Sequence, residues 1–464
     1  MASRAGQLGR ENITRHSTLV QEKIEPTRFE TRQAIDASLA RSDAARLPLA
    51  ERPDNDAIGQ APAYAKLELP TGQACGWHAT SLFSGCGGLD LGFLQQGIFP
   101  VSAYDIDRKS LATYVQNLPG RAFRTDLSRL KPHNSMPTIL LAGAPCQGFS
   151  TSGKRNVADP RNALLMRVAD IAVASRPRVV IVENVPAALS GAHLRLWEGL
   201  EDRLRSAGYN VRRLLLDGQA CGLGQRRKRL FLLSWLGSDS IRIEIPRQQS
   251  LSVREALTDL TQDEDIEWPR EGTRDWLIAQ QIGAGQRVSN VRISERTIAT
   301  WDIPEVYGAT TELQKLILVS ITRLRRRERV RRHGDGDPVH INRLVSEFGN
   351  AIIQELPLLE SAGYIRISGD FLELRQTYNG RYRRLEWDAP SPTVDTRFGR
   401  PDLFLHPSDN RGMTPREAAR IQGFPDSFRF AGSKSDTFTQ IGNAVPPPMA
   451  AILANFVREA ILKA

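Results

Sequence analysis

The chain has 464 residues, enough for about two or three domains, and its formal net charge of +10 at pH 7 favours a polyanionic partner. No stretch approaches the ~18 apolar residues of a membrane span, and the N-terminus lacks the apolar segment of a secretory signal. The four cysteines, Cys75, Cys86, Cys146 and Cys221, show neither metal-ligand nor disulfide spacing. We therefore expect a cytoplasmic protein that has no contact with a membrane.

The first 75 residues are polar, mixed in charge and interrupted by prolines. We interpret residues 1–75 as an N-terminal extension and linker, with a helix over about residues 30–47. This segment either contacts the polyanionic partner or packs on the rest of the protein, and its composition does not distinguish the two.

A glycine-rich turn follows the first predicted strand. Residues 78–83 form this strand, residues 84–88 turn sharply, and residues 89–96 begin a helix. Glycines let backbone amides approach a ligand, and a helix N-terminus adds partial positive charge. Gly87 and Gly88 are adjacent, unlike the spacing of the dinucleotide fingerprint, so a nicotinamide cofactor is disfavoured.

Three further strands are each followed by a residue suited to chemistry. Residues 101–104 end at Asp105, which lies roughly twenty residues beyond the glycines, a spacing at which an acid binds ribose hydroxyls. Residues 138–142 lead to a loop that presents Cys146, and four β-branched residues precede Glu183. The alternatives are an inert buried thiol and a structural ion pair. Because ligands of open α/β sheets bind at the carboxyl ends of strands, we expect these residues to share one site.

Five motifs in order give the chain a resemblance to a known family. They are SLFSGCGGLDLGF (81–93), GAPCQGFS (143–150), ENV (183–185), QRRKR (225–229) and QIGNAVPPP (440–448). Together they resemble the motif set of the DNA (cytosine-5)-methyltransferases, over about residues 79–235 and 385–460.

The resemblance implies an α/β fold: a Rossmann-like S-adenosylmethionine-dependent methyltransferase sheet with a smaller inserted target-recognition domain. The boundaries that follow are residues 76–240 for the first part of the catalytic domain, 241–385 for the target-recognition region and 386–464 for the catalytic return and C-terminal helix. Within the return, Pro415 begins and Gly423 ends a predicted helix.

The resemblance also implies S-adenosylmethionine as cofactor. Its expected contacts are Phe83, Ser84, Gly85, Gly87, Gly88, Leu89, Asp105, Ile106, Asp126, Leu127, Pro145, Asn443 and Val445. Asp105 would bind the ribose, Ile106 would pack on adenine, although the family often has a larger side chain there, and Asp126 would accept from the adenine amino group. The alternative for Asp126 is a helix N-cap before residues 127–129.

The catalytic residues that the resemblance implies are Cys146, Glu183, Arg227 and Arg229, in a site closed over a flipped cytosine by residues 151–161. Within the basic run we expect Arg227 and Arg229 to face inward and Arg226 and Lys228 to face solvent or phosphate. The DNA contacts expected near the site are Gln147, Ser150 and Arg226. A basic run is otherwise most often a solvated face.

Residues 241–385 lack the shared motifs. Within them, residues 310–375 read as helix, helix and hairpin, which resembles a winged helix-turn-helix; a generic helical insert is the alternative. An arginine-rich run over residues 323–332 contains Arg325, Arg326 and Arg329, which we expect to contact DNA. Its alternative is a solvated helix face.

We therefore expect a monomeric DNA cytosine-5 methyltransferase that acts on a specific duplex sequence through a Cys146 adduct at carbon 6 of the flipped-out base. Its setting would be a restriction-modification or related prokaryotic system, with a restriction endonuclease acting separately. The alternatives are an RNA methyltransferase on the same scaffold and a catalytically inactive DNA-binding regulator. The intact set of Cys146, Glu183 and Arg229 argues against the regulator.

Overall fold

The computed structural model describes residues 76–130, 138–145, 163–191, 193–238, 242–260, 269–330 and 336–462. The predicted helix over residues 30–47, the loop from Cys146 onward with Gln147 and Ser150, and the predicted lid over residues 151–161 lie outside these ranges. Among the described residues, no helix is both long and apolar enough to cross a membrane.

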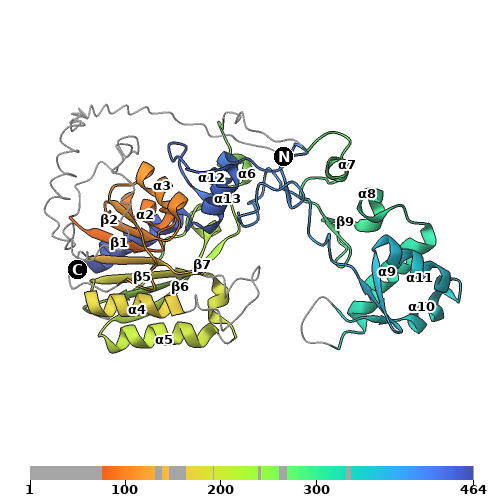
Figure 1. Ribbon diagram of the computed structural model, residues 1–464, viewed down its shortest axis with the longest axis horizontal. Coiled ribbons are helices and arrows are strands. Elements are labelled where there is room, and N and C mark those ends of the chain that lie inside the picture. Colours follow the sequence, from red (N-terminus) through yellow and green to blue (C-terminus); the bar gives the residue numbers. More distant parts are fainter. Residues whose placement is uncertain are drawn as a thin grey trace, which may run out of the picture. The chain divides into compact units, whose positions relative to one another are not determined.

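A seven-stranded sheet forms the centre of the catalytic part (Figure 1). Its strands are β1 (His78–Leu82), β2 (Phe99–Asp105), β3 (Arg121–Arg124), β4 (Ile139–Gly143), β5 (Val179–Asn184), β6 (Asn210–Asp217) and β7 (Lys228–Trp235). The order is β3-β2-β1-β4-β5-β7-β6, with β7 antiparallel to both neighbours and all other pairs parallel. This mixed sheet confirms the predicted α/β fold class.

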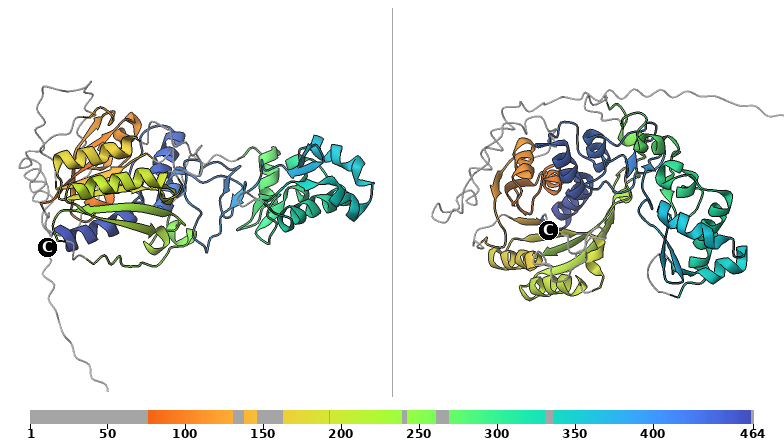
Figure 2. Two further views of the ribbon diagram at one scale, coloured as in Figure 1. Left: turned by 90° about the horizontal axis from the view of Figure 1, so that it is seen from below. Right: turned by 45° about the vertical axis from the view of Figure 1, so that its right-hand side comes forward.

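Helices cover both faces of this sheet. They are α2 (Gly88–Leu94), α3 (Arg108–Asn117), α4 (Ala163–Ser175), α5 (His193–Ser206) and α14 (Pro447–Phe456). Helices α12 (Pro415–Gln422) and α13 (Lys434–Asn443) pack against each other. Helices α4 and α5 lie side by side on one face (Figure 2). Helices α2 and α14 pack against each other and on the opposite face.

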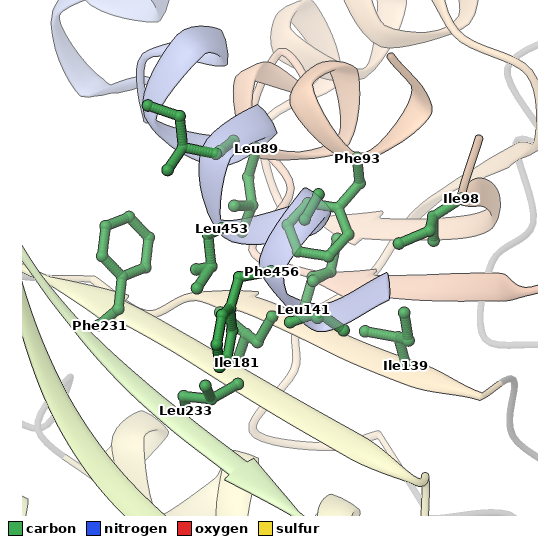
Figure 3. Close-up of a cluster of buried hydrophobic side chains, with 14 of the residues drawn as sticks. Leu89, Phe93, Ile98, Ile139, Leu141, Ile181, Phe231, Leu233, Leu453 and Phe456 are labelled. Carbon is green, nitrogen blue, oxygen red and sulfur yellow. The ribbon is translucent and has the colours of Figure 1, made fainter. Parts of the chain in front are cut away.

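The alternation of side chains along the strands creates two hydrophobic cores. In β4, Ile139 and Leu141 pack with Phe93 and Leu453 of α2 and α14, and Figure 3 shows these side chains together. Leu140, between them, points to the other face and packs with residues of α4 and α5. Burial on both faces explains why these strands read as continuous apolar runs in the sequence.

Part of residues 241–385, the predicted target-recognition region, packs around a further hydrophobic core. Its elements are α9 (Glu312–Arg327), β10 (Val339–His340), α10 (Ile341–Phe348), α11 (Ile352–Ala362), β11 (Ile365–Ser368) and β12 (Phe371–Leu374). The three strands form an antiparallel sheet in the order β10-β12-β11. The succession of helices and terminal hairpin confirms the order predicted for a winged helix-turn-helix.

Short elements connect the two parts. They are α6 (Val253–Ala256), α7 (Arg274–Gln280), β8 (Arg287–Ser289), β9 (Thr297–Ala299), α8 (Pro304–Tyr307), β13 (Arg383–Arg384) and β14 (Phe404–Leu405). Strand β8 pairs with β9, and β13 pairs with β14. The described residues also include the predicted helix of the catalytic return: α12 starts at Pro415, and Gly423 ends it in the left-handed conformation, with φ 88°.

Candidate active site

The loops after β1, β4 and β5 meet at the carboxyl edge of the sheet. In the β4–β5 pair, Gly143 lies directly opposite Glu183. A Cβ atom added to Gly143 would lie 3.3 Å from the carbonyl oxygen of Phe83, so the β1 loop passes close to this pair. Cys146, three residues beyond Gly143, lies outside the described residues, but the strand that leads to it ends beside Glu183.

The loop after β1 holds an unusual backbone conformation. Phe83 has φ 54°, a left-handed value that is rare for a bulky residue, and Gly85 and Gly87 have φ 53° and 91°. The amide of Gly85 donates to Oδ2 of Asp105 at 2.8 Å, which ties the loop to the end of β2. Backbone strain of this kind is typical of functional sites.

Two groups at this edge are suited to bind hydroxyls. Asp105 accepts from the amides of Gly85 and Asp107, and burial raises its pKa despite these bonds. The Oγ atom of Ser84 is buried and has no hydrogen-bond partner in the protein. A buried hydroxyl without a partner is costly unless a ligand satisfies it. The pair therefore fits the ribose of a nucleoside-type cofactor.

The glycines also permit close packing behind the loop. A Cβ atom on Gly87 would lie 2.2 Å from Leu118, and one on Gly88 would lie 2.4 Å from the carbonyl oxygen of Val445. Gly88 and Val445 therefore bring the first and last motifs into contact. Leu89 is buried in the core beneath them.

A buried carboxylate that the sequence analysis did not single out supports this loop. Asp90 is fully buried and accepts from Ser81 at 2.9 Å and from the Tyr114 hydroxyl at 2.9 Å. Burial raises the pKa of Asp90 to about 6. Its position inside the motif SLFSGCGGLDLGF was the available signal.

The remaining expected cofactor residues differ in exposure. Ile106 is 64% exposed directly after Asp105. Asp126 is exposed beside the end of β2, and its carboxylate accepts from the amide and hydroxyl of Ser128. No helix follows Asp126 in the described residues, so the alternative of a helix N-cap is wrong; the carboxylate closes a turn. Leu127 is buried, Pro145 is half-buried, and Asn443 is exposed at the end of α13.

Glu183 and Arg229 form an ion pair at the β5 and β7 ends. Nε of Arg229 lies 2.7 Å from Oε1 of Glu183, and both side chains are largely buried. Burial raises the pKa of Glu183, while the charges of Arg229 and Arg227 act in the opposite direction. The ion pair considered as the structural alternative is thus present, yet the carboxyl group still holds a proton more tightly than an ordinary glutamate.

Arg227 connects the basic motif with the motif over residues 440–448 and with the segment around Val394. Its guanidinium donates to the carbonyl oxygens of Val394, Gly442 and Ala444 at 2.8 to 3.0 Å. Arg227 is 1% exposed, whereas Arg226 and Lys228 are exposed, which confirms the predicted alternation along the basic run. Arg227 therefore positions backbone segments around the site.

Two glutamines extend this network. Gln225 donates to Oε1 of Gln422 at 2.6 Å and accepts from the amide of Val394. Gln422 donates to the carbonyl oxygens of Ile441 and Ala444. The sequence analysis missed both residues; Gln225 carried a signal as the first residue of the basic motif, and Gln422 carried none.

The two cysteines that the structure describes are unsuited to nucleophilic chemistry. Cys86 and Cys221 are buried, and burial raises their thiol pKa values to about 12 and about 11. A nucleophilic cysteine needs a lowered pKa.

The arginine-rich end of α9 requires one correction. Arg325 is 6% exposed, so its side chain is packed inside the domain, a position that does not suit the expected DNA contact. Arg326 and Arg329 are exposed, and Arg326 donates to the carbonyl oxygen of Val291 at 2.8 Å.

The sheet order, the glycine loop and the strand-end acids define a Rossmann-like methyltransferase. The model of C-5 cytosine-specific DNA methylases matches residues 78–459, and the chain belongs to this family. It is a DNA (cytosine-5)-methyltransferase.

The chain is similar to several named enzymes. It is 28% identical to the Type II methyltransferase M.AgeI of Thalassovita gelatinovora, over 82% of this chain and 99% of that protein. It is 27% identical to the Type II methyltransferase M.DdeI of Desulfomicrobium norvegicum, over 80% and 86%. A solved E. coli structure, described as a prophage-encoded DNA modification methyltransferase, matches 84% of this chain and all of that chain, with a TM-score of 0.52 and 22% identity. This last likeness supports the fold.

Proposed function

We propose that the protein transfers a methyl group from S-adenosylmethionine to carbon 5 of a cytosine flipped out of a specific duplex sequence, through a covalent Cys146 adduct. The observation that carries this proposal is the buried ion pair of Glu183 and Arg229. Glu183 lies opposite Gly143, which precedes Cys146 by three residues in the chain. A proton-holding carboxyl and a guanidinium beside a strand-end thiol suit attack on an electron-poor ring.

Cytosine carbon 5 is too weak a nucleophile to accept a methyl group unaided. Addition of the Cys146 thiolate to carbon 6 converts the ring to an enamine and makes carbon 5 reactive. The negative charge that develops is relieved when Glu183 donates its proton to ring nitrogen 3, while Arg229 binds the ring carbonyl oxygen. After carbon 5 has taken the methyl group, its proton is lost to solvent water, Cys146 leaves as a thiolate and the proton on ring nitrogen 3 returns to Glu183, which restores the aromatic ring.

The residues of the glycine loop fit the cofactor. S-adenosylmethionine, when bound, supplies the electrophilic methyl group. The carboxylate of Asp105 and the hydroxyl of Ser84 would hold its ribose, and the amides near Gly85 would lie along its polar end. Ile106 would cover adenine, Asp126 would accept from its amino group, and Phe83, Leu127, Pro145, Asn443 and Val445 would line the pocket.

A duplex base cannot be reached while stacked, so the target must leave the helix. Gln147 and Ser150 beside Cys146 are proposed to contact the opened DNA. Residues 241–385 would read the sequence, with Arg326 and Arg329 on phosphates or guanine. The names of the relatives support a setting in restriction-modification, with an endonuclease acting separately.

Methyl transfer to duplex DNA and to transfer RNA tests this proposal. The wild-type protein should label duplex DNA alone, and digestion should yield 5-methylcytosine. Cys146→Ala should abolish labelling and leave cofactor affinity within about a few fold. Cys221→Ala is the matched control and should keep wild-type activity, since this thiol is buried in the hydrophobic core and its pKa is raised to about 11. Full activity of Cys146→Ala would reject the covalent mechanism, and labelling of RNA alone would reject the substrate.

A further inference from the structure

Three arginines from separate segments converge near the basic motif. Arg287 lies on β8 and Arg383 on β13, and these backbones run side by side, with the Arg384 amide donating to Gln286 at 3.0 Å and the Val288 amide to Arg381 at 3.0 Å. Arg287 and Arg383 each lie between these two bonds.

The third arginine comes from the catalytic part. The backbone of Arg226 is held on both sides: its amide donates to Ser391 at 2.8 Å, and its carbonyl oxygen accepts from Thr393 at 2.6 Å. Arg226 and Arg287 both repel the charge on Arg383, so all three guanidinium groups lie within electrostatic range.

None of the three side chains has a protein acceptor among the described residues. Nε of Arg383 is buried and unbonded. The nearby carboxylates serve other arginines, since Asp402 pairs with Arg381 and Arg400. A buried donor without an acceptor and like charges without a counter-ion both cost stability.

The adjacent residue shows the opposite pattern. Arg384 donates five hydrogen bonds, four to carbonyl oxygens and one to Asn410, and is 5% exposed. Arg384 is therefore a structural arginine, fully satisfied in the protein. Arg383, one position earlier on the same short strand, has an unbonded buried donor and positively charged neighbours. Both features suit an anionic ligand.

We propose that Arg226, Arg287 and Arg383 form one phosphate site that binds a single backbone phosphodiester of the DNA beside the target nucleotide. A guanidinium is always charged and offers a planar fork that matches phosphate oxygens. Arg226 stands three residues before Arg229, which holds Glu183, so an extended segment of about 10 Å separates the phosphate site from the base site. This proposal depends on the proposed function in one respect, namely that DNA is the ligand.

The site also connects recognition with chemistry. Arg226 belongs to the catalytic motif, whereas Arg287 and Arg383 lie within residues 241–385, the predicted target-recognition region. One phosphate bound by all three would fix the register of the strand between the bases that are read and the base that is methylated, since phosphate contacts position a protein on DNA.

DNA binding by full-length protein over a range of salt concentrations tests the site. Arg226→Gln, Arg287→Gln and Arg383→Gln should each weaken binding to a duplex by about tenfold. The triple variant should lower the magnitude of the log–log salt slope by about 0.9, the value for one phosphate. Arg195→Gln, which removes an exposed arginine of α5, is the charge-matched control and should change neither quantity.

Thermal unfolding separates a ligand site from a structural one. Arg384→Gln should lower the melting temperature because it leaves buried carbonyl groups unbonded. Arg383→Gln should not, because it removes repulsion and an unsatisfied donor. A large drop for Arg383→Gln with unchanged DNA affinity would overturn the proposal. A slope change near 2.7 would show three separate phosphate contacts and reject the shared site. If the wild-type protein bound DNA through these residues but transferred no methyl group, the proposed function would be rejected and the phosphate site would stand.

Discussion

Glu183 is subject to two opposing effects. Removal from water disfavours its charged form, and the guanidinium groups of Arg229 and Arg227 favour it. Because desolvation is the larger effect, the pKa is raised, and the proton persists to higher pH than on a surface glutamate. Arg229 can hold the carboxyl in place without fully depriving it of the proton that the reaction needs.

We expect Glu183→Gln to slow methyl transfer by about 10²–10⁴-fold, the usual contribution of a positioned proton donor. Glutamine keeps an oxygen that can accept from Arg229, so cofactor and DNA affinities should stay within about a few fold. Single-turnover rates measured alongside both affinities would check this.

The pH dependence of the same variant gives an independent test. The protonated form of Glu183 is the active one, so the wild-type rate should fall as pH rises through its raised pKa. The acid side should report formation of the Cys146 thiolate. Glu183→Gln cannot lose a proton, so its profile should lack the alkaline fall. An unchanged alkaline limb in the variant would assign the proton to another group.

At the scale of elements, the sequence predicted the strands that are buried in the core, because their apolar side chains form recognisable runs. Strands β4 and β5 are covered on both faces and read as short apolar runs. The sequence analysis did not predict α3 and α13, whose stability depends on tertiary contacts such as Thr113 with Gln440 and Lys109 with Asp436. The network of Gln225, Arg227 and Gln422 was missed for the same reason, since it joins segments that only the fold brings together.

The contact between α2 and α14 provides a test of this packing. A Cβ atom on Gly92 would lie 2.4 Å from Cβ of Ala450 and 2.5 Å from the Pro447 carbonyl oxygen. We expect Gly92→Ala to force the helices apart and lower the free energy of unfolding by about 1–3 kcal/mol. Gly199→Ala in α5 is the control, because its Cβ would meet only Met166, at 3.6 Å. Urea unfolding would measure the free energy of unfolding of both variants. A Gly92→Ala protein at least as stable as the wild type would contradict the close approach of α2 and α14.

At the scale of the molecule, residues 312–374, the predicted winged helix, pack around their own hydrophobic core, which contains Ile317, Leu356 and Leu372. Its third helix, α11, contains no lysine or arginine, and Ile353 and Leu358 are 52% and 57% exposed on it. The basic charge lies instead at the end of α9. Recognition through this domain would therefore combine phosphate contacts from α9 with apolar contacts, such as those to thymine methyl groups.

Removal of residues 310–375 should separate recognition from cofactor binding. Tyr307 and Tyr378 stack edge to face with ring centroids 5.2 Å apart, so a short glycine-serine linker can join the two ends. Trp301, which packs on the deleted helices, would be changed to Gln in the same variant to keep the uncovered surface polar. We expect cofactor affinity within about a few fold of wild type and loss of site-specific methylation, measured by calorimetry and by sequencing of methylated positions in genomic DNA.

Because the deletion variant could lose activity by misfolding, a second variant that retains residues 310–375 is also needed. Arg326→Gln with Arg329→Gln removes two exposed charges from the end of α9 and leaves the buried Arg325 in place. If both arginines contact phosphates, the salt slope should fall by up to about 1.8 while cofactor affinity stays unchanged. If the double variant keeps the wild-type slope and the deletion still methylates the same sites, these arginines are a solvated helix face, and sequence recognition lies within residues 241–309.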